Sequence, residues 1–184
     1  MVVNGKLKEI RVSEKMTVPK LVKKKKAGEK IVMITSYDAI FSKILDGLDL
    51  DIVLVGDSLG MVVQGHPNTL PVTMDEMVYH CKAVSRCISR AHTVGDMPFL
   101  SFQCSIEQAI QNAGRLIKEG GVEAVKLEGG LHMVDTIRAL TRIGIPVMAH
   151  IGLTPQSIHQ FGGYRIQGKK STTEAAATTR KVPR

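Results

Sequence analysis

Short β-branched runs that end in polar residues recur along this chain, and they constrain its fold more than any other feature. The clearest run is Ile-Val-Leu-Val at residues 52–55, which has the length and composition of a buried strand and is followed by Asp57 and Ser58. An acid and a hydroxyl at the exit of a buried strand are costly to desolvate unless a ligand or a metal pairs with them. The run therefore predicts a strand that delivers functional side chains.

Three further predicted strands end in the same way. Their polar side chains are Asp96 in residues 93–99, Lys126 and Glu128 in residues 122–128, and His150 in residues 145–151. An earlier apolar run, residues 30–36, adds a fifth strand. Because active sites in α/β folds lie at the carboxyl edge of the sheet, we expect these side chains to converge there.

Amphipathic segments with clear start signals alternate with the strands. Thr73 and Glu76 form a capping-box pattern, and so do Ser105 and Gln108. Asp38 is placed to cap a helix with an apolar face at helical spacing. The residues of that face are Ile40, Phe41, Ile44, Leu45 and Leu48. Strand and helix alternate five times, which predicts a parallel sheet with right-handed crossovers.

Two α/β architectures fit this alternation, an open doubly wound sheet and a (β/α)₈ TIM-type barrel. Polar groups at nearly every strand end favour the barrel, whose mouth gathers all strand ends around one site. A complete barrel needs roughly 250 residues, so this chain of 184 residues is predicted to contain about the first five βα units, with the remainder missing. We divide it into a basic extension and first helix (1–29), a partial barrel (30–168), and a low-complexity, disordered tail (169–184).

The basic excess of the chain lies at its two ends. Residues 1–30 carry 10 Lys and Arg against 3 acids, and residues 165–184 carry 6 against 1. Residues 31–164 carry 9 against 13, so the body is mildly acidic although the formal net charge is +8. Nucleic-acid binding is therefore not expected.

Cysteine spacing and hydropathy favour a reducing compartment. The three cysteines form no C-x-x-C pair, which argues against disulfides and zinc, and Cys81 and Cys87 lie on a predicted buried helix stripe. His92 is expected at the surface or in a loop. The chain has neither an 18-residue apolar run nor a signal-peptide pattern, so we expect no membrane association and a cytoplasmic location.

The polar strand ends suggest a metal site. Lys126 and Glu128 are two residues apart, so they point to the same side of the sheet, where they could form a structural ion pair. With Asp57 and Asp96 added, three carboxylates would repel one another unless protons or a cation intervene. Oxygen ligands without a Cys or His cluster suit Mg²⁺, and Lys126 would then bind an anionic substrate oxygen. His150 either donates a hydrogen bond or packs as a core histidine.

The tetrapeptide G-D-S-L at residues 56–59 also occurs in hydrolases that use its serine as the nucleophile. That mechanism needs a histidine base held by an acid, supplied in such hydrolases as D-x-x-H. None of the six histidines follows an Asp by three residues, so this interpretation is not favoured.

Taken together, the motifs resemble those of the ketopantoate hydroxymethyltransferase (3-methyl-2-oxobutanoate hydroxymethyltransferase) family. The matching pieces are T-S-Y-D (35–38), V-G-D-S-L-G-M-V-V-Q-G (55–65), T-L-P-V-T (69–73), D-M-P-F (96–99), V-K-L-E-G-G (125–130), H-I-G-L-T-P-Q-S (150–157) and G-G-Y-R-I-Q-G (162–168). They follow the family's order over roughly residues 30–168, which makes the set far more specific than any single piece.

This resemblance implies a (β/α)₈ barrel in a homo-oligomer that works in pantothenate synthesis. The implied reaction transfers a hydroxymethyl group from 5,10-methylenetetrahydrofolate to 3-methyl-2-oxobutanoate, giving 2-dehydropantoate. By motif position, the resemblance implies Mg²⁺ ligands at Asp57, Asp96 and Glu128. It implies substrate contacts at Asp57, Ser58, Asp96 and Lys126, and a catalytic histidine at His150.

The chain departs from the family after residue 168. The resemblance implies a general base, a Glu at the end of a later strand, and Glu174 in the low-complexity tail is no substitute for it. We therefore expect a truncated or frame-shifted reading that keeps most of the metal and keto-acid site but lacks the base and barrel closure. The alternatives are a non-catalytic fragment that binds a ligand or a partner subunit, and another Mg²⁺-dependent barrel enzyme of the phosphoenolpyruvate mutase/isocitrate lyase type.

Overall fold

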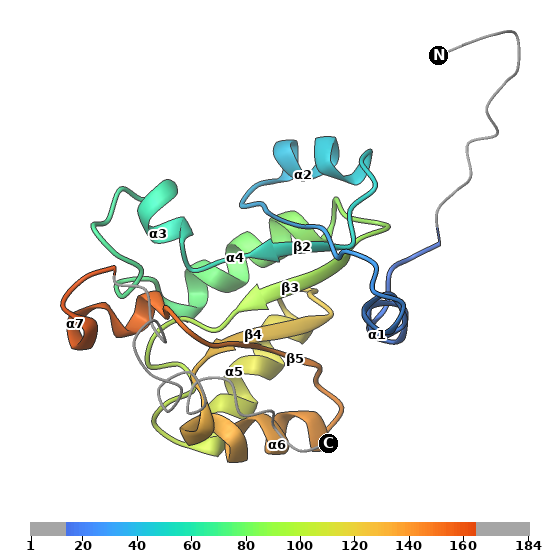
Figure 1. Ribbon diagram of the computed structural model, residues 1–184. Helices are drawn as coiled ribbons and strands as arrows, with labels where there is room; N and C mark the ends of the chain where they lie inside the picture. The colour runs from blue at the N-terminus through green and yellow to red at the C-terminus, as the bar shows by residue number, and fades with distance from the viewer. Residues whose placement is uncertain (1–13, 165–184) are drawn as a thin grey trace, which may run out of the picture.

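The protein is described here by a computed structural model that covers residues 14–164 and is built on one parallel β-sheet (Figure 1). The strands are β1 (Met33–Thr35), β2 (Ile52–Val55), β3 (His92–Asp96), β4 (Ala124–Glu128) and β5 (Val147–His150). Their spatial order is β1-β2-β3-β4-β5, so each strand pairs with its neighbour in sequence. This order confirms the barrel-type prediction, because a doubly wound sheet reverses direction at a switch point.

Helices alternate with the strands, and α4, α5 and α6 cover one face of the sheet. They are α1 (Val18–Lys26), α2 (Ala39–Asp46), α3 (Leu59–Val62), α4 (Met74–Ser85), α5 (Ile106–Lys118), α6 (Val134–Arg142) and α7 (Ile158–Phe161), with two 3₁₀ turns, η1 (Leu131–Met133) and η2 (Pro155–Ser157). Figure 1 shows α4, α5 and α6 side by side against β2 to β5. The described part of the chain is therefore a run of βα units, as predicted.

Capping residues start three of these helices where the sequence predicts. Asp38 accepts a hydrogen bond from the backbone N–H of Phe41 at 2.8 Å. Thr73 and Glu76 form both halves of a capping box at the start of α4. Ser105 accepts from the backbone N–H of Gln108, which caps α5. Each cap pairs a backbone donor that the first helical turn leaves free.

The two faces of the sheet have different roles. On the helix-covered face, alternate strand residues join the main core with Cys81 and the buried faces of α4 to α6. On the opposite face, a smaller apolar cluster lies toward the amino-terminal ends of the strands; it contains Ile52, Leu54, Val94 and Ala124. Because side chains alternate along a strand, Asp96, Lys126 and Glu128 continue this second face toward the carboxyl edge. The core thus occupies one face, and the other ends in polar groups.

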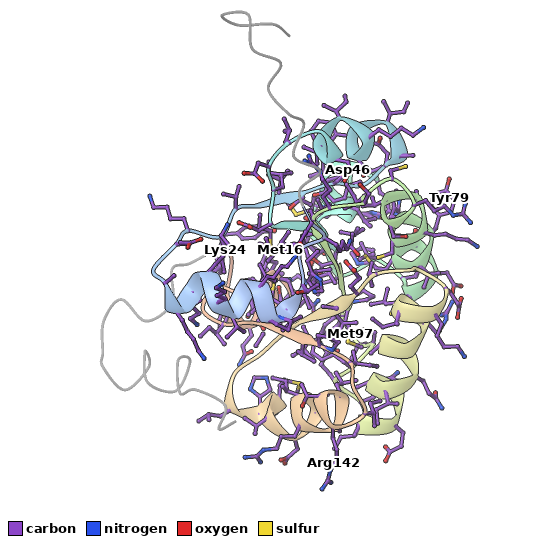
Figure 2. All side chains as sticks on the ribbon, turned by 90° about the vertical axis from the view of Figure 1, so that its right-hand side faces the viewer. Met16, Lys24, Asp46, Tyr79, Met97 and Arg142 are labelled. Atoms are coloured by element: carbon purple, nitrogen blue, oxygen red, sulfur yellow. The ribbon has the colours of Figure 1, made fainter. Side chains whose placement is uncertain are left out.

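Helix α1 closes the amino-terminal end of the second face. Its Leu21 packs against the smaller apolar cluster. Lys24 forms an ion pair with buried Asp51 at 2.7 Å, and Lys15 pairs with Glu123 at 2.9 Å. Figure 2 views the molecule from this side, with α1 and Lys24 toward the viewer. The predicted basic extension therefore includes a helix that packs on the sheet. Residues 1–13 and the predicted tail at 169–184 lie outside the described residues.

Two sequence expectations differ from the structure. Of the predicted apolar face of α2, only Leu45 is buried; Ile40, Phe41, Ile44 and Leu48 are exposed. The residues that α2 buries are Ser42 and Leu45, and the helix contacts α4. His92 was expected at the surface or in a loop but is buried as the first residue of β3, 5% exposed. It lies two residues before Val94, so the strand's alternation places it on the same face.

The sheet has two edges in the described part of the chain, β1 and β5. Met33 of β1 is exposed, and β5 is only partly covered. Exposed edges of this kind carry unpaired backbone groups that can bond to another strand. Between residues 14 and 164, no helix has the length and hydrophobicity needed to span a membrane.

Candidate active site

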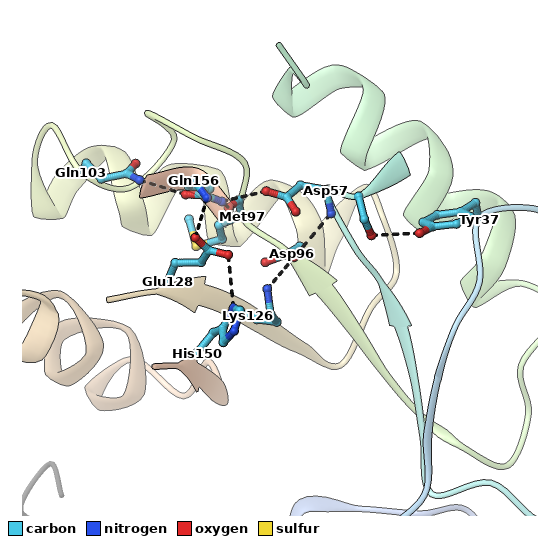
Figure 3. A network of polar contacts seen from close by, with 10 residues as sticks. Tyr37, Asp57, Asp96, Met97, Gln103, Lys126, Glu128, His150 and Gln156 are labelled. Carbon is cyan, nitrogen blue, oxygen red and sulfur yellow. Dashed lines mark hydrogen bonds and ion pairs between the residues drawn. The ribbon is translucent and has the colours of Figure 1, made fainter. Parts of the chain in front are cut away.

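A pocket of about 320 Å³ lies at the carboxyl edge of the sheet. It is lined by Leu54, Gly56, Asp57, Ser58, Met61, Thr69, Asp96, Lys126, Glu128, His150, Pro155 and Tyr164. All six residues that the sequence analysis selected as site residues are among them. They follow or end four different strands, β2 to β5, so the parallel order of the sheet brings them together (Figure 3).

Lys126 and Asp96 form the central ion pair of this pocket. Their strands pair in a register that sets the two residues side by side, and Lys126 Nζ lies 2.6 Å from Asp96 Oδ2. Both side chains are buried. The sequence left open an ion pair between Lys126 and Glu128; the ion-pair partner of Lys126 is instead Asp96, one strand away.

Burial dominates the electrostatics of the two aspartates. It raises the pKa of Asp96 to about 7, although the ammonium group of Lys126 acts in the opposite direction. Burial also raises the pKa of Asp57, and a hydrogen bond from Gln156 opposes that rise. The backbone N–H of Asp57 points at Asp96 Oδ2 at 3.4 Å. Burial therefore opposes ionisation of both aspartates, and their negative charges are stabilised only by groups that come close to them, such as Lys126 and Gln156.

Glu128 is the most fully engaged carboxylate of the pocket. Its Oε1 lies 3.2 Å from His150 Nδ1, and the register of β4 and β5 sets these two residues side by side. Its Oε2 accepts a hydrogen bond from the backbone N–H of Gln156 at 2.9 Å. His150 therefore contacts a carboxylate rather than packing only among apolar groups.

Ser58 is held by a tyrosine from the preceding βα loop. Its Oγ lies 2.8 Å from the hydroxyl of Tyr37, and the backbone carbonyl of Tyr37 lies 2.6 Å from His80 Nδ1. In the described part of the chain, Ser58 thus pairs with a phenol and not with a histidine. The serine-hydrolase interpretation finds no support in this geometry.

The donor set fits Mg²⁺ bound by two carboxylates. Asp96 Oδ1 is buried and has no hydrogen-bond partner among the described residues, which is costly unless a cation or substrate pairs with it. Within residues 14–164, no group of three His, Cys, Asp or Glu side chains is arranged to hold a metal ion. Mg²⁺ is often held by one or two carboxylates, with water and substrate completing its shell. Asp57 and Asp96 suit that role, and Glu128 as a third ligand stays a prediction.

Sequence reasoning missed the residue that connects most of this site, Gln156. It bonds to Asp57 and Glu128 and to the backbone carbonyl of Met97. Two signals pointed to it: its place after the strand that ends at His150, and its position in the motif H-I-G-L-T-P-Q-S at residues 150–157. A single glutamine in a loop is otherwise indistinguishable from a surface residue.

The model of the family described as ketopantoate hydroxymethyltransferase matches residues 15–182. The chain belongs to the ketopantoate hydroxymethyltransferase family. The match includes every pocket residue named above and continues past residue 168, beyond the motifs that carry the resemblance.

Curated relatives support the same family. A 3-methyl-2-oxobutanoate hydroxymethyltransferase from Geobacter metallireducens is 58% identical over 159 residues, which is 86% of this chain and 60% of the relative. One from Geobacter sulfurreducens is 60% identical over 154 residues, 84% of this chain and 58% of the relative. The chain therefore spans about three fifths of the length of these ketopantoate hydroxymethyltransferase family members.

Solved structures of low sequence identity share the fold. A 2,3-dimethylmalate lyase, described as a PEP mutase/isocitrate lyase superfamily member, aligns with a TM-score of 0.54 at 15% identity, covering 71% of this chain and 51% of the lyase. A phosphonopyruvate hydrolase aligns with a TM-score of 0.59 at 10% identity, covering 75% of this chain and 51% of the hydrolase. At such identities the likeness concerns architecture alone. It agrees with a partial (β/α)₈ fold for this ketopantoate hydroxymethyltransferase family member.

Proposed function

We propose that the pocket binds 3-methyl-2-oxobutanoate together with Mg²⁺, as the keto-acid site of a ketopantoate hydroxymethyltransferase. One observation carries the proposal: six residues chosen from sequence motifs, spread from Asp57 to His150, line a single pocket at the carboxyl edge of the sheet. Membership of the family supports this proposal. The proposed reaction moves a hydroxymethyl group from 5,10-methylenetetrahydrofolate to C3 of the keto acid and yields 2-dehydropantoate.

Each side chain of the pocket has a task that follows from its contacts. Lys126 uses one of its three N–H donors on Asp96, which leaves donors for a carboxylate oxygen of the keto acid. Ser58, held by Tyr37, presents its hydroxyl to the same ligand. His150 is oriented by Glu128 through Nδ1, so its other ring nitrogen is free of that contact. Together these groups bind and orient an anionic substrate.

A bound metal would supply the activation that these side chains lack. Mg²⁺ held by Asp57 and Asp96, with Glu128 as the third acid, would withdraw electron density from the keto group and acidify the adjacent C3–H. A base must still take that proton. The described carboxylates are already engaged, Asp57 by Gln156, Asp96 by Lys126 and Glu128 by His150. We therefore assign the base to no described residue of the pocket.

Deuterium exchange at C3 tests this assignment. The full 184-residue chain is incubated with Mg²⁺ and 3-methyl-2-oxobutanoate in D₂O, and loss of the C3 proton signal is followed by NMR beside the Geobacter sulfurreducens relative. We expect binding of the keto acid, seen as saturation-transfer signals, with exchange far slower than in the relative. Exchange at the relative's rate would show that the chain has its own base. Absence of keto-acid binding would show that the pocket is not this site.

We also propose that the chain works as a homo-oligomer in the cytoplasm. Four exposed apolar residues in α2 and just after it, Ile40, Phe41, Ile44 and Leu48, support self-association, because large exposed apolar patches often mark protein–protein interfaces. Light scattering coupled to size exclusion gives the mass directly. A monomer at all concentrations would contradict the proposal.

A further inference from the structure

Gln156 occupies a central position among the strand ends. It is the middle residue of η2, in the loop that follows β5, and only 6% of it is exposed. Pro155 begins this turn, and the backbone N–H of Ser157 bonds to the carbonyl of Thr154 at 2.9 Å. The turn is therefore fixed locally, which directs the Gln156 side chain inward.

The carboxamide of Gln156 uses its full donor capacity. Nε2 donates to Asp57 Oδ2 and to the backbone carbonyl of Met97, both at 2.9 Å. Oε1 accepts from Gln103 Nε2 at 3.0 Å. Because Asp57 and the Met97 carbonyl can only accept, the NH₂ group must face them, and this settles the orientation of the amide. Figure 3 shows this amide between Gln103 and Asp57.

Two of these three side-chain contacts fix the amide rather than serve the pocket. The Met97 carbonyl holds one N–H, and Gln103 holds the oxygen, so the amide plane cannot turn without losing both bonds. The remaining N–H is then aimed at Asp57 Oδ2. Any buried amide needs partners for its donors and its acceptor. The specific feature of Gln156 is that one of its partners is the carboxylate of Asp57, which lines the pocket.

We propose that Gln156 is a positioning residue for the Asp57 carboxylate. By holding Oδ2, it presents Oδ1 to the cation and the keto acid, and it acts through Asp57 without touching either. This inference rests on the proposed function, because it takes Asp57 as a metal ligand. The backbone N–H of Gln156, which bonds to Glu128, is kept by any substitution except proline, so the side-chain contribution can be isolated.

Binding of Mn²⁺, a spectroscopic probe for Mg²⁺, tests the proposal on the full chain. The affinity of folded protein for Mn²⁺ is measured by electron paramagnetic resonance for the wild type and for Gln156→Met, which keeps the length of the side chain and removes its donors. We expect Mn²⁺ affinity to fall about 10-fold or more, the usual effect of removing a hydrogen-bond partner of a metal ligand. Gln111→Met, the same change at an exposed position of α5, should leave the affinity unchanged.

A second variant keeps the test decisive if Gln156→Met does not fold. Gln103→Ala leaves Gln156 in place but frees its oxygen, so we expect a smaller loss of Mn²⁺ affinity in a folded protein. Wild-type affinity in folded Gln156→Met, or in Gln103→Ala if the former does not fold, would overturn the inference while leaving the proposed function intact. Failure of the wild type to bind Mn²⁺ would overturn both.

Discussion

Lys126 Nζ and Asp96 Oδ2 lie 2.6 Å apart on adjacent strands, and both side chains are almost fully buried. A buried ion pair of this kind is expensive to break from one side, because the partner is left as an unpaired charge. We predict that Lys126→Met lowers the free energy of unfolding by about 3–5 kcal/mol at pH 8. Urea unfolding followed by circular dichroism measures the change.

The cost of Lys126→Met should depend on pH. The pKa of Asp96 is about 7 with Lys126 present, and the ammonium group lowers it, so its removal raises that pKa further. At pH 5.5 Asp96 is then protonated and leaves no buried charge, which predicts a smaller loss of stability than at pH 8. Lys118→Met, at the exposed end of α5, serves as the control. Equal losses at both pH values would contradict the assigned charge state.

The hydrogen bond between Tyr37 and Ser58 should contribute to binding of the keto acid. We predict that Tyr37→Phe, which frees the Ser58 hydroxyl from its 2.8 Å contact, raises the Kd for 3-methyl-2-oxobutanoate about fivefold, as expected for the loss of about 1 kcal/mol. Titration calorimetry with Mg²⁺ present gives the Kd. Tyr79→Phe makes the same change on the exposed surface of α4 and should have no effect. A Kd that Tyr37→Phe leaves unchanged would remove Ser58 from the binding set.

Buried His92 should make the fold sensitive to mild acid. Burial lowers the pKa of His92, while Glu123 opposes and Lys15 adds to that shift. The folded state therefore binds fewer protons than the unfolded state, in which the pKa of histidine is about 6.5. The contribution of His92 is complete above that value and is lost as the pH falls through it toward the folded pKa.

Replacing the imidazole isolates this effect. We predict that His92→Leu retains more of its pH 8 stability at pH 5.5 than the wild type does, measured as free energies of unfolding in urea. His159→Leu, on exposed α7, should follow the wild type. Other groups titrate in the variant and in the wild type alike, so their effect drops out when the two changes in the free energy of unfolding are subtracted. Parallel curves for His92→Leu and the wild type would show that His92 does not titrate as described.

Asp51 should anchor α1 to the sheet. Its carboxylate binds Lys24 and also accepts from the backbone N–H of Val32 at 2.8 Å. We predict that Asp51→Ala lowers the free energy of unfolding by about 1–3 kcal/mol, because it leaves that backbone donor and the ammonium group unpaired. It should also speed tryptic cleavage within α1, observed by mass spectrometry. Glu107→Ala, at an exposed position of α5, is the control, and equal cleavage rates would contradict the role of Asp51.

The sequence located β2 closely because burial on both faces leaves an unbroken apolar run there. Residues 52–55 were predicted with their observed bounds. At the edge of the sheet the signal is weaker: β1 spans Met33–Thr35, shorter than the apolar run at 30–36, since only one neighbouring strand provides hydrogen bonds. The exposed face of α2 shows a second limit of prediction from sequence. Amphipathic spacing identifies an apolar face, but it does not show which part of the protein, if any, covers that face.

Site residues were predictable where they lie directly at a strand end. Asp96 and Lys126 were expected at the same edge of the sheet, but their ion pair depends on the register of β3 and β4, which the sequence does not reveal. Gln156 lies in a turn whose path no periodicity describes, and its contacts span 99 residues of sequence to Asp57. His92 marks an error of a different kind. His92 and Asp96 are four residues apart in β3, so both side chains lie on the same face of the sheet. This spacing could have been used to predict that His92 is buried.

The unbroken strand order has a consequence for biosynthesis of the fold. Since every strand bonds to the one made just before it, the wall that bears Asp57, Asp96, Lys126 and Glu128 can grow in step with translation. Within residues 14–164, each of β2 to β5 can pair with the preceding strand as soon as it is made, and contacts between successive units form faster than those between remote ones. All residues that line the pocket are therefore available to a nascent chain once Tyr164 has left the ribosome.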